Sequence, residues 1–388
     1  MVRKSRKLLM GITIVAVVGV IIGSWLGLLY AYYGHQTFFF LVKAPPRTIV
    51  EYSKNIVSAP VSAPEPNSTQ TTPDTTAPPV PTSHTIPTMS HMYQKLNNCG
   101  PSSVAMAASS YDITFDQFAA AEVLKGNDKD KNVSPTELVA FLSTQHLSAI
   151  HRVNGTPAQI EALVAQGIPV IVEQWLEKRG TGELVGHYRV VRGYNRQRQL
   201  FITNDSFNGP NFTIPYAQFE EWWRPFNRTY IPVYRPDQAE TVRTILGSDW
   251  EVAANWQRAS QQAQQDIQNH NDGYAYFNAG ITAVALEKYP EAVAAFNKAL
   301  TFSFPEHFLW YQFDLFEAYF QVGEYDKVLE LTDHLLKEAG EVEEARYYRG
   351  LVFEHQGEIE KAKAEAQKAV TANPRYQPAQ DLLTRLAS

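Results

Sequence analysis

The chain has 388 residues, of which 44% are hydrophobic and 19% are charged. This length exceeds one ordinary domain, and this composition excludes a wholly disordered protein. The net charge of −6 is unevenly distributed: residues 1–43 carry +5, residues 44–247 carry −1 and residues 248–388 carry −10. Because no segment after the N-terminal end is basic, we expect no nucleic-acid partner.

The chain contains a single cysteine, Cys99. One thiol cannot form a disulfide within the chain or a cysteine-rich metal site. The histidines never fall at the HExxH spacing of zinc peptidases. Residues 127–132 imitate the start of a calcium loop, but Val133 and Val139 stand where such a loop has glycine and glutamate. We therefore expect neither a cofactor nor a metal.

Residues 8–34 form an apolar stretch without a charged side chain, long enough to cross a bilayer as a helix. Four basic residues precede it, and Trp25 and three tyrosines lie towards its other end. This asymmetry predicts a single-pass transmembrane helix in the cell membrane, with residues 1–7 in the cytoplasm and everything after the helix outside. A cleaved signal peptide is the alternative, but no convincing small-x-small cleavage site follows the stretch.

Residues 35–89 are rich in proline, serine and threonine, and ten of the 23 prolines of the chain lie between residues 44 and 88. Such a segment cannot bury enough apolar surface to fold, and repeated proline keeps it extended. We interpret it as a stalk that holds the folded part away from the membrane. A proline-rich docking ligand is the alternative, but no basic flank accompanies it.

The pattern over residues 90–236 predicts helices first and a sheet after them. A helix is expected over 99–126 with a break near Tyr111, and two more follow capping motifs at Ser134 and Thr156. A period of two in β-branched and aromatic residues then predicts strands, with one short helix at 216–223 between the last two. The expected strands are 168–176, 187–194, 200–205 and 229–234. Helices followed by antiparallel strands make an α+β domain.

Cys99 is expected at the first turn of a helix. Free backbone N–H groups and the positive end of the helix dipole favour a thiolate there, so this is a suitable place for a nucleophile. Gln94 lies five residues upstream. Its side-chain amide and the Cys99 backbone N–H together would form a two-donor hole for a developing oxyanion.

A thiolate nucleophile needs a base that also hands a proton to the leaving group. Among His146, His151 and His187, the last is best placed, because it begins an alternating strand after a glycine. Asp205 ends the next strand, 18 residues further on. A hairpin between the two strands would lay this carboxylate beside His187 and hold the tautomer of its imidazole.

Several motifs carry a resemblance to a known family. The chain contains Q-x4-C-G-P-S, then G-H-Y-R-V-V-R-G-Y, then a strand ending in N-D and the helix Y-A-Q-F-E-E-W-W. Over roughly residues 90–235 it resembles the stand-alone relatives of the bacteriocin-leader-processing (double-glycine) cysteine peptidases, a papain-like group. The resemblance implies a papain-like fold and hydrolysis of a peptide or protein substrate through a thioester.

In that family the matching positions imply Cys99 as nucleophile, His187 as general base and acid, Asp205 as the orienting carboxylate and Gln94 as oxyanion donor. One departure is Ser206, where relatives usually have proline. Another is the lack of a G-x4-G-K-[ST] nucleotide-binding loop, so leader processing fused to export is not expected.

Residues 249–388 contain a repeated helical pattern that superimposes Glu287, Gly323 and Gly357, at offsets of 36 and 34 residues. The pattern resembles tetratricopeptide repeats, which stack into an all-α solenoid. We expect repeats at about 273–306, 309–342 and 343–376, preceded by a helix over 249–270 and followed by one over 377–387. An unrelated helical bundle is the alternative.

The acidic charge of the repeat domain favours a neutral or basic protein partner in its groove, although an acidic surface also serves solubility. The whole sequence predicts a membrane-anchored, extracytoplasmic cysteine peptidase with a module that binds a substrate or partner. A catalytically inactive, membrane-tethered adaptor is one alternative, but an adaptor would have no physical use for the four candidate site residues. A cell-wall peptide amidase or transpeptidase is another, because it would use the same Cys/His chemistry.

Overall fold

The structure of the protein, a computed structural model, describes residues 80–127, 130–178, 182–305 and 307–387. The predicted transmembrane helix at 8–34 and most of the predicted stalk lie outside the described residues. Within the described ranges, no helix combines the length and the apolarity that a bilayer crossing requires.

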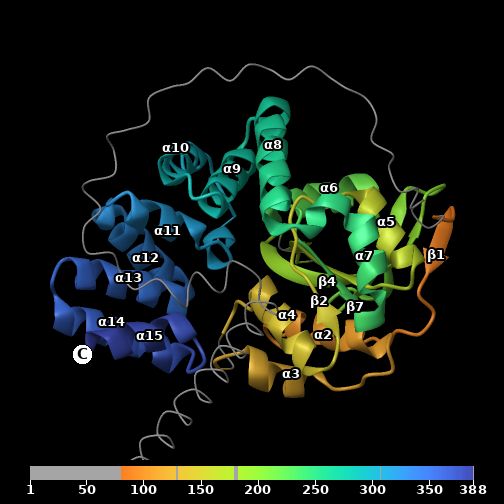
Figure 1. Ribbon diagram of the computed structural model, residues 1–388, viewed down its shortest axis with the longest axis horizontal. Helices are drawn as coiled ribbons and strands as arrows, with labels where there is room; N and C mark the ends of the chain where they lie inside the picture. The colour runs from red at the N-terminus through yellow and green to blue at the C-terminus, as the bar shows by residue number, and fades with distance from the viewer. Residues whose placement is uncertain (1–79, 128–129, 179–181, 306, 388) are drawn as a thin grey trace, which may run out of the picture. The chain divides into compact units, whose positions relative to one another are not determined.

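An antiparallel sheet forms the centre of the first folded part (Figure 1). Its strand order is β2-β7-β3-β4-β5-β6, and β1 pairs with the far end of β4. The strands are β1 (Ser83–Thr85), β2 (Ser148–Ala149), β3 (Val170–Glu177), β4 (Leu184–Asn195), β5 (Leu200–Asp205), β6 (Gly209–Pro215) and β7 (Tyr230–Tyr234). The four strands predicted from the alternating pattern therefore correspond to β3, β4, β5 and β7.

Strand β1 lies inside the segment that the sequence predicts as stalk. Ser83, His84 and Thr85 pair with the last three residues of β4, and the following Ile86 is 3% exposed. Pairing and burial fix this segment although it is flanked by proline, because the edge of β4 supplies its hydrogen-bond partners. The folded part thus begins before residue 90.

Helices α2 to α7 flank the sheet (Figure 1). They are α2 (Cys99–Ser109), α3 (Gln117–Leu124), α4 (Pro135–Thr144), α5 (Pro157–Ala165), α6 (Tyr216–Trp223) and α7 (Ala239–Leu246). Both predicted capping motifs are confirmed: the Ser134 and Thr156 side chains each accept the backbone N–H three residues on, and Glu137 and Gln159 reciprocate. The break predicted near Tyr111 is the gap between α2 and α3.

The C-terminal region is all-helical, and Figure 1 shows its helices in sequence from blue-green to blue. A Cβ on Gly280 would lie 2.5 Å from the ring of Phe296, so a small residue is required where α9 and α10 pack together. The helices are α8 (Val252–His270), α9 (Gly273–Ala285), α10 (Tyr289–Ala299), α11 (Asp314–Gln321), α12 (Tyr325–Ala339), α13 (Glu343–His355), α14 (Ile359–Ala372) and α15 (Gln377–Leu386).

The hydrophobic core of the helical region also contains two side chains of the sheet domain, Trp175 from β3 and Phe226. The indole of Trp175 is 2% exposed, and its ring centroid lies 4.8 Å from that of Phe226 and 5.9 Å from that of Phe308. Burying an aromatic side chain of this size contributes about 1.5–3 kcal/mol. The two parts of the chain therefore stabilise each other through a shared core.

Candidate active site

Cys99 is the first residue of α2, and the residue as a whole is half-buried. The preceding Asn98 makes no side-chain cap, so the first N–H groups of the helix are left for other acceptors. The sulfur accepts from the backbone N–H of Gly100 and from that of Tyr188 on β4. The helix start and the strand thus both direct donors at the thiol.

His187 lies on β4 and Asp205 ends β5, and both are almost fully buried. The His187 Nε2 lies 3.1 Å from Asp205 Oδ1. The imidazole also forms a hydrogen bond with the Cys99 thiol. The structure therefore brings together three of the predicted site residues, with the imidazole between the sulfur and the carboxylate.

The three groups shift one another's pKa values. Burial raises the pKa of the Cys99 thiol, but the hydrogen bond and charge of His187, together with the N–H groups of Tyr188 and Gly100, outweigh burial, so the net pKa is lower than that of an ordinary thiol. Burial lowers the pKa of His187, but Asp205 and the hydrogen bond to Cys99 together more than compensate, so the net pKa is raised. Both shifts favour a thiolate paired with an imidazolium.

Arg189 is a buried member of the site that the sequence analysis did not identify. Its Nε donates to Asp205 Oδ2 at 2.6 Å, and its other nitrogens donate to Gln174 Oε1 at 2.8 Å and to the carbonyl of Trp175 at 3.1 Å. Burial would raise the pKa of Asp205, but His187 and Arg189 hold it well below the usual range. The period of two along β4 could have revealed Arg189, because it places His187 and Arg189 on one face.

Gln94 lies against Ser206, the residue after the candidate carboxylate. Its backbone N–H donates to the Ser206 carbonyl at 2.9 Å, and its Oε1 accepts from the Ser206 hydroxyl at 2.7 Å. The side-chain nitrogen of Gln94 has no hydrogen-bond partner among the described residues. The serine hydroxyl thus fixes the oxygen end of the amide and leaves its N–H donors available.

Glu173 is a second group that the sequence did not indicate. It lies on β3 directly opposite Tyr188 of β4, is 7% exposed, and lines the pocket that contains Cys99 and His187. Burial, followed by the charge of Cys99, raises the pKa of Glu173 to about 8. This carboxyl is therefore mostly neutral at pH 7, so it adds little negative charge beside the thiolate.

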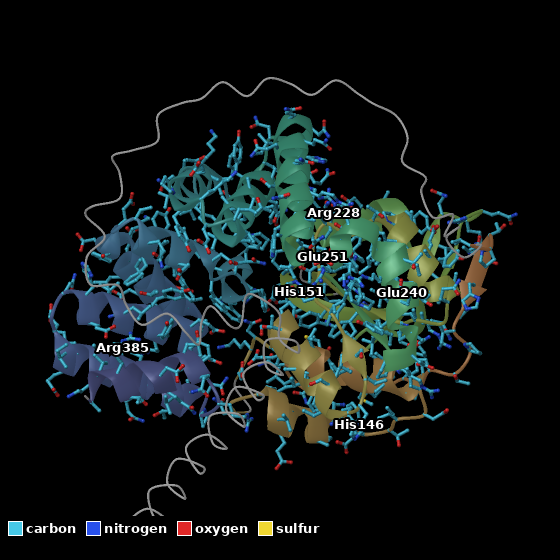
Figure 2. The ribbon with its side chains drawn as sticks, in the orientation of Figure 1. His146, His151, Arg228, Glu240, Glu251 and Arg385 are labelled. Carbon is cyan, nitrogen blue, oxygen red and sulfur yellow. The ribbon has the colours of Figure 1, made fainter. Side chains whose placement is uncertain are left out.

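The other two candidate histidines do not join the site. His146 follows the end of α4, and His151 follows β2. Figure 2 shows the two labelled side chains lying apart from each other. Burial lowers the pKa of His151 to about 4, so its imidazole is neutral at physiological pH. Across the described ranges, no group of three His, Cys, Asp or Glu side chains is arranged to hold a metal ion.

The sheet domain has a counterpart among known protein families. Residues 84–231 match the sequence profile of the Peptidase_C39 like family. The match begins within β1 and ends within β7, so it includes at least part of every strand of the sheet. A search of curated proteins finds no match.

Two matching solved structures are peptidase domains. One is a double glycine motif protease from an AMS/PCAT transporter in complex with the leader peptide, 16% identical over 39% of this chain and 94% of that chain, with a TM-score of 0.30. The other is the peptidase domain of Streptococcus ComA, a bi-functional ABC transporter involved in quorum sensing, 15% identical over 38% of this chain and 98% of that chain, with a TM-score of 0.30. The family match and the described elements give the chain a Peptidase_C39-like α+β domain, followed by an all-helical C-terminal region.

Proposed function

We propose that this protein is a cysteine peptidase that hydrolyses a peptide bond through a thioester on Cys99. The observation that carries the proposal is the convergence of a helix-start thiol, a buried imidazole and a buried carboxylate, with pKa shifts that activate the thiol. The match of the sheet domain to a peptidase family supports the same reaction class.

In the proposed mechanism, the Cys99 thiolate attacks the carbonyl carbon of the scissile bond. The resulting oxyanion accepts hydrogen bonds from the Cys99 N–H and the Gln94 side-chain amide. His187 gives its proton to the leaving amine as the thioester forms, and then takes a proton from the water that hydrolyses the thioester. Asp205, held by Arg189, orients the imidazole throughout.

We further propose a peptide substrate, since one of the matched structures contains a leader peptide. The paired helices α9 to α14 are proposed to be three tetratricopeptide repeats that bind a substrate or partner, because Glu287, Gly323 and Gly357 all have a positive φ at corresponding turns. Residues 8–34 are proposed to anchor the protein in the cell membrane, with the described domains on the extracytoplasmic side.

The test uses the full-length protein in a mild detergent, incubated with a pool of synthetic peptides and analysed by mass spectrometry. We expect cleavage by the wild type, none by Cys99→Ala, and cleavage close to the wild-type level by the control variant His151→Ala. Cleavage that persists in Cys99→Ala would refute the proposal. It would also be refuted if the wild type cleaved no peptide and its thiol reacted no faster than an ordinary one.

A further inference from the structure

The pocket beside Cys99 is almost completely filled. Its free volume is about 10 Å³, which is room for about one water molecule. The lining comes from α2, the segment before α4, and strands β3 and β4, together with a single residue of the helical region, Tyr311. A peptide side chain does not fit into a space of this size while the lining groups keep these positions.

Tyr311 occupies the edge of β4 that faces the thiol. Strand β5 pairs with β4 only from Val190 onwards, so the earlier residues of β4 have no strand on that edge. The N–H groups of Gly186 and Tyr188, two residues apart, point to the same edge. The Tyr188 N–H donates to Cys99, and the Gly186 N–H lies near the Tyr311 hydroxyl and lowers its pKa.

A free strand edge is where an extended peptide adds its own backbone hydrogen bonds. Tyr311 therefore covers Gly186, whose N–H a substrate would use next to the sulfur. The ring is also tightly seated, since a Cβ on Gly186 would lie 2.8 Å from two of its carbon atoms. Burial, followed by the charge of Cys99, raises the pKa of Tyr311, so the phenol stays neutral.

The helical region holds Tyr311 in place from both sides of the pocket. On the α2–α4 side, the Lys131 ammonium donates to the carbonyl of Ala339 and lies 5.0 Å from the ring centroid of Trp310, the neighbour of Tyr311. On the β4 side, His307 Nδ1 lies 3.5 Å from a carboxylate oxygen of Glu183. These contacts fix His307 and Trp310, which precede Tyr311 in the chain.

We propose that Tyr311 inhibits the peptidase in cis: it occupies the substrate's pairing position on Gly186, and a peptide reaches Cys99 only when this side chain withdraws. The expected effect on turnover rests on the proposed function. The closure itself concerns access to the thiol, which can be measured without any substrate.

The access test compares two thiol reagents on the full-length protein, small iodoacetamide and a bulky biotin-maleimide. A change in the thiol pKa alters both labelling rates alike, whereas opening the pocket favours the larger reagent. We expect Tyr311→Ala to raise the rate of maleimide labelling about tenfold, which corresponds to about 1.4 kcal/mol of closure, and to raise the iodoacetamide rate less. Tyr311→Phe keeps the ring and should give a smaller increase. The control Tyr325→Ala removes a ring that packs against His355, away from the pocket, and should change neither rate.

The turnover test measures kcat/KM on a cleaved peptide with the same variants. We expect Tyr311→Ala to exceed the wild type and Tyr325→Ala to equal it. Equal labelling of wild type and Tyr311→Ala by both reagents, with both proteins folded by circular dichroism, would overturn the inference. A lower kcat/KM in Tyr311→Ala would also overturn it, because Tyr311 would then help to bind the substrate. Faster labelling without any peptidase activity would uphold the closure and refute the proposed function instead.

Discussion

The activation of Cys99 by His187 can be tested by replacing His187 with alanine and titrating the thiol. Two opposing influences act on the sulfur: burial, which raises its pKa and is the larger single effect, and the hydrogen bond and charge of His187, which lower it. Removing the imidazole leaves burial opposed only by the N–H groups of Gly100 and Tyr188. We therefore expect the pKa of Cys99 to move from below to above the ordinary value of about 8.5.

The expected size of the effect depends on how it is measured. A lower thiol pKa gives more thiolate but a weaker nucleophile, so each unit changes the labelling rate at acidic pH only about threefold to fourfold. The midpoint of the rate against pH reports the pKa directly and avoids this compensation. A shift of one unit in this midpoint corresponds to about 1.4 kcal/mol of interaction with His187.

The assay is iodoacetamide labelling followed by intact mass, and it needs no site assignment because Cys99 is the only cysteine. The wild type should show a midpoint below about 8.5, and His187→Ala one above it. His151→Ala is the matched control, since His151 makes no contact with the sulfur. A midpoint that is unchanged by His187→Ala, or raised equally by His151→Ala, would refute the reasoning.

Two further outcomes follow from the groups that support the site. Ser206→Ala removes the hydroxyl that holds Gln94, so kcat should fall about twofold to tenfold, the value of one hydrogen bond, with KM unchanged. Ser206→Thr should restore kcat, whereas a change in KM alone would contradict a role in positioning the oxyanion donor. Arg189→Met leaves the buried Asp205 charge without its guanidinium and should lower the free energy of unfolding in urea by about 3–5 kcal/mol, whereas a loss below about 1 kcal/mol would contradict the burial of this pair.

Features set by neighbours in the sequence could be predicted well. The caps at Ser134 and Thr156 need only residues three positions apart, and both occur as predicted. The helix at 216–223 occurs with the predicted bounds. The contact between His187 and Asp205 followed from two adjacent strands joined by a short turn, which is also a local relation.

Features that depend on distant partners could not be predicted. Strand β1 has three residues and exists because it pairs with a strand about 110 residues further on. Tyr311 lies more than 200 residues after Cys99, and no period or motif around it indicates a place in the pocket. The burial of Glu173 and its raised pKa likewise arise from packing of the sheet against α2 and the segment before α4, which composition does not encode.

Trp175 has a double role with a consequence for the evolution of the chain. Its indole packs in the core of the helical region, while its carbonyl accepts from the guanidinium that holds Asp205. A recombination event that exchanged the helical region for an unrelated module would expose this indole to solvent. The same event would disturb the hydrogen bonds that support the Asp205 carboxylate. Such hybrids should be eliminated by selection, so the two parts are expected to be inherited together and to diversify in step.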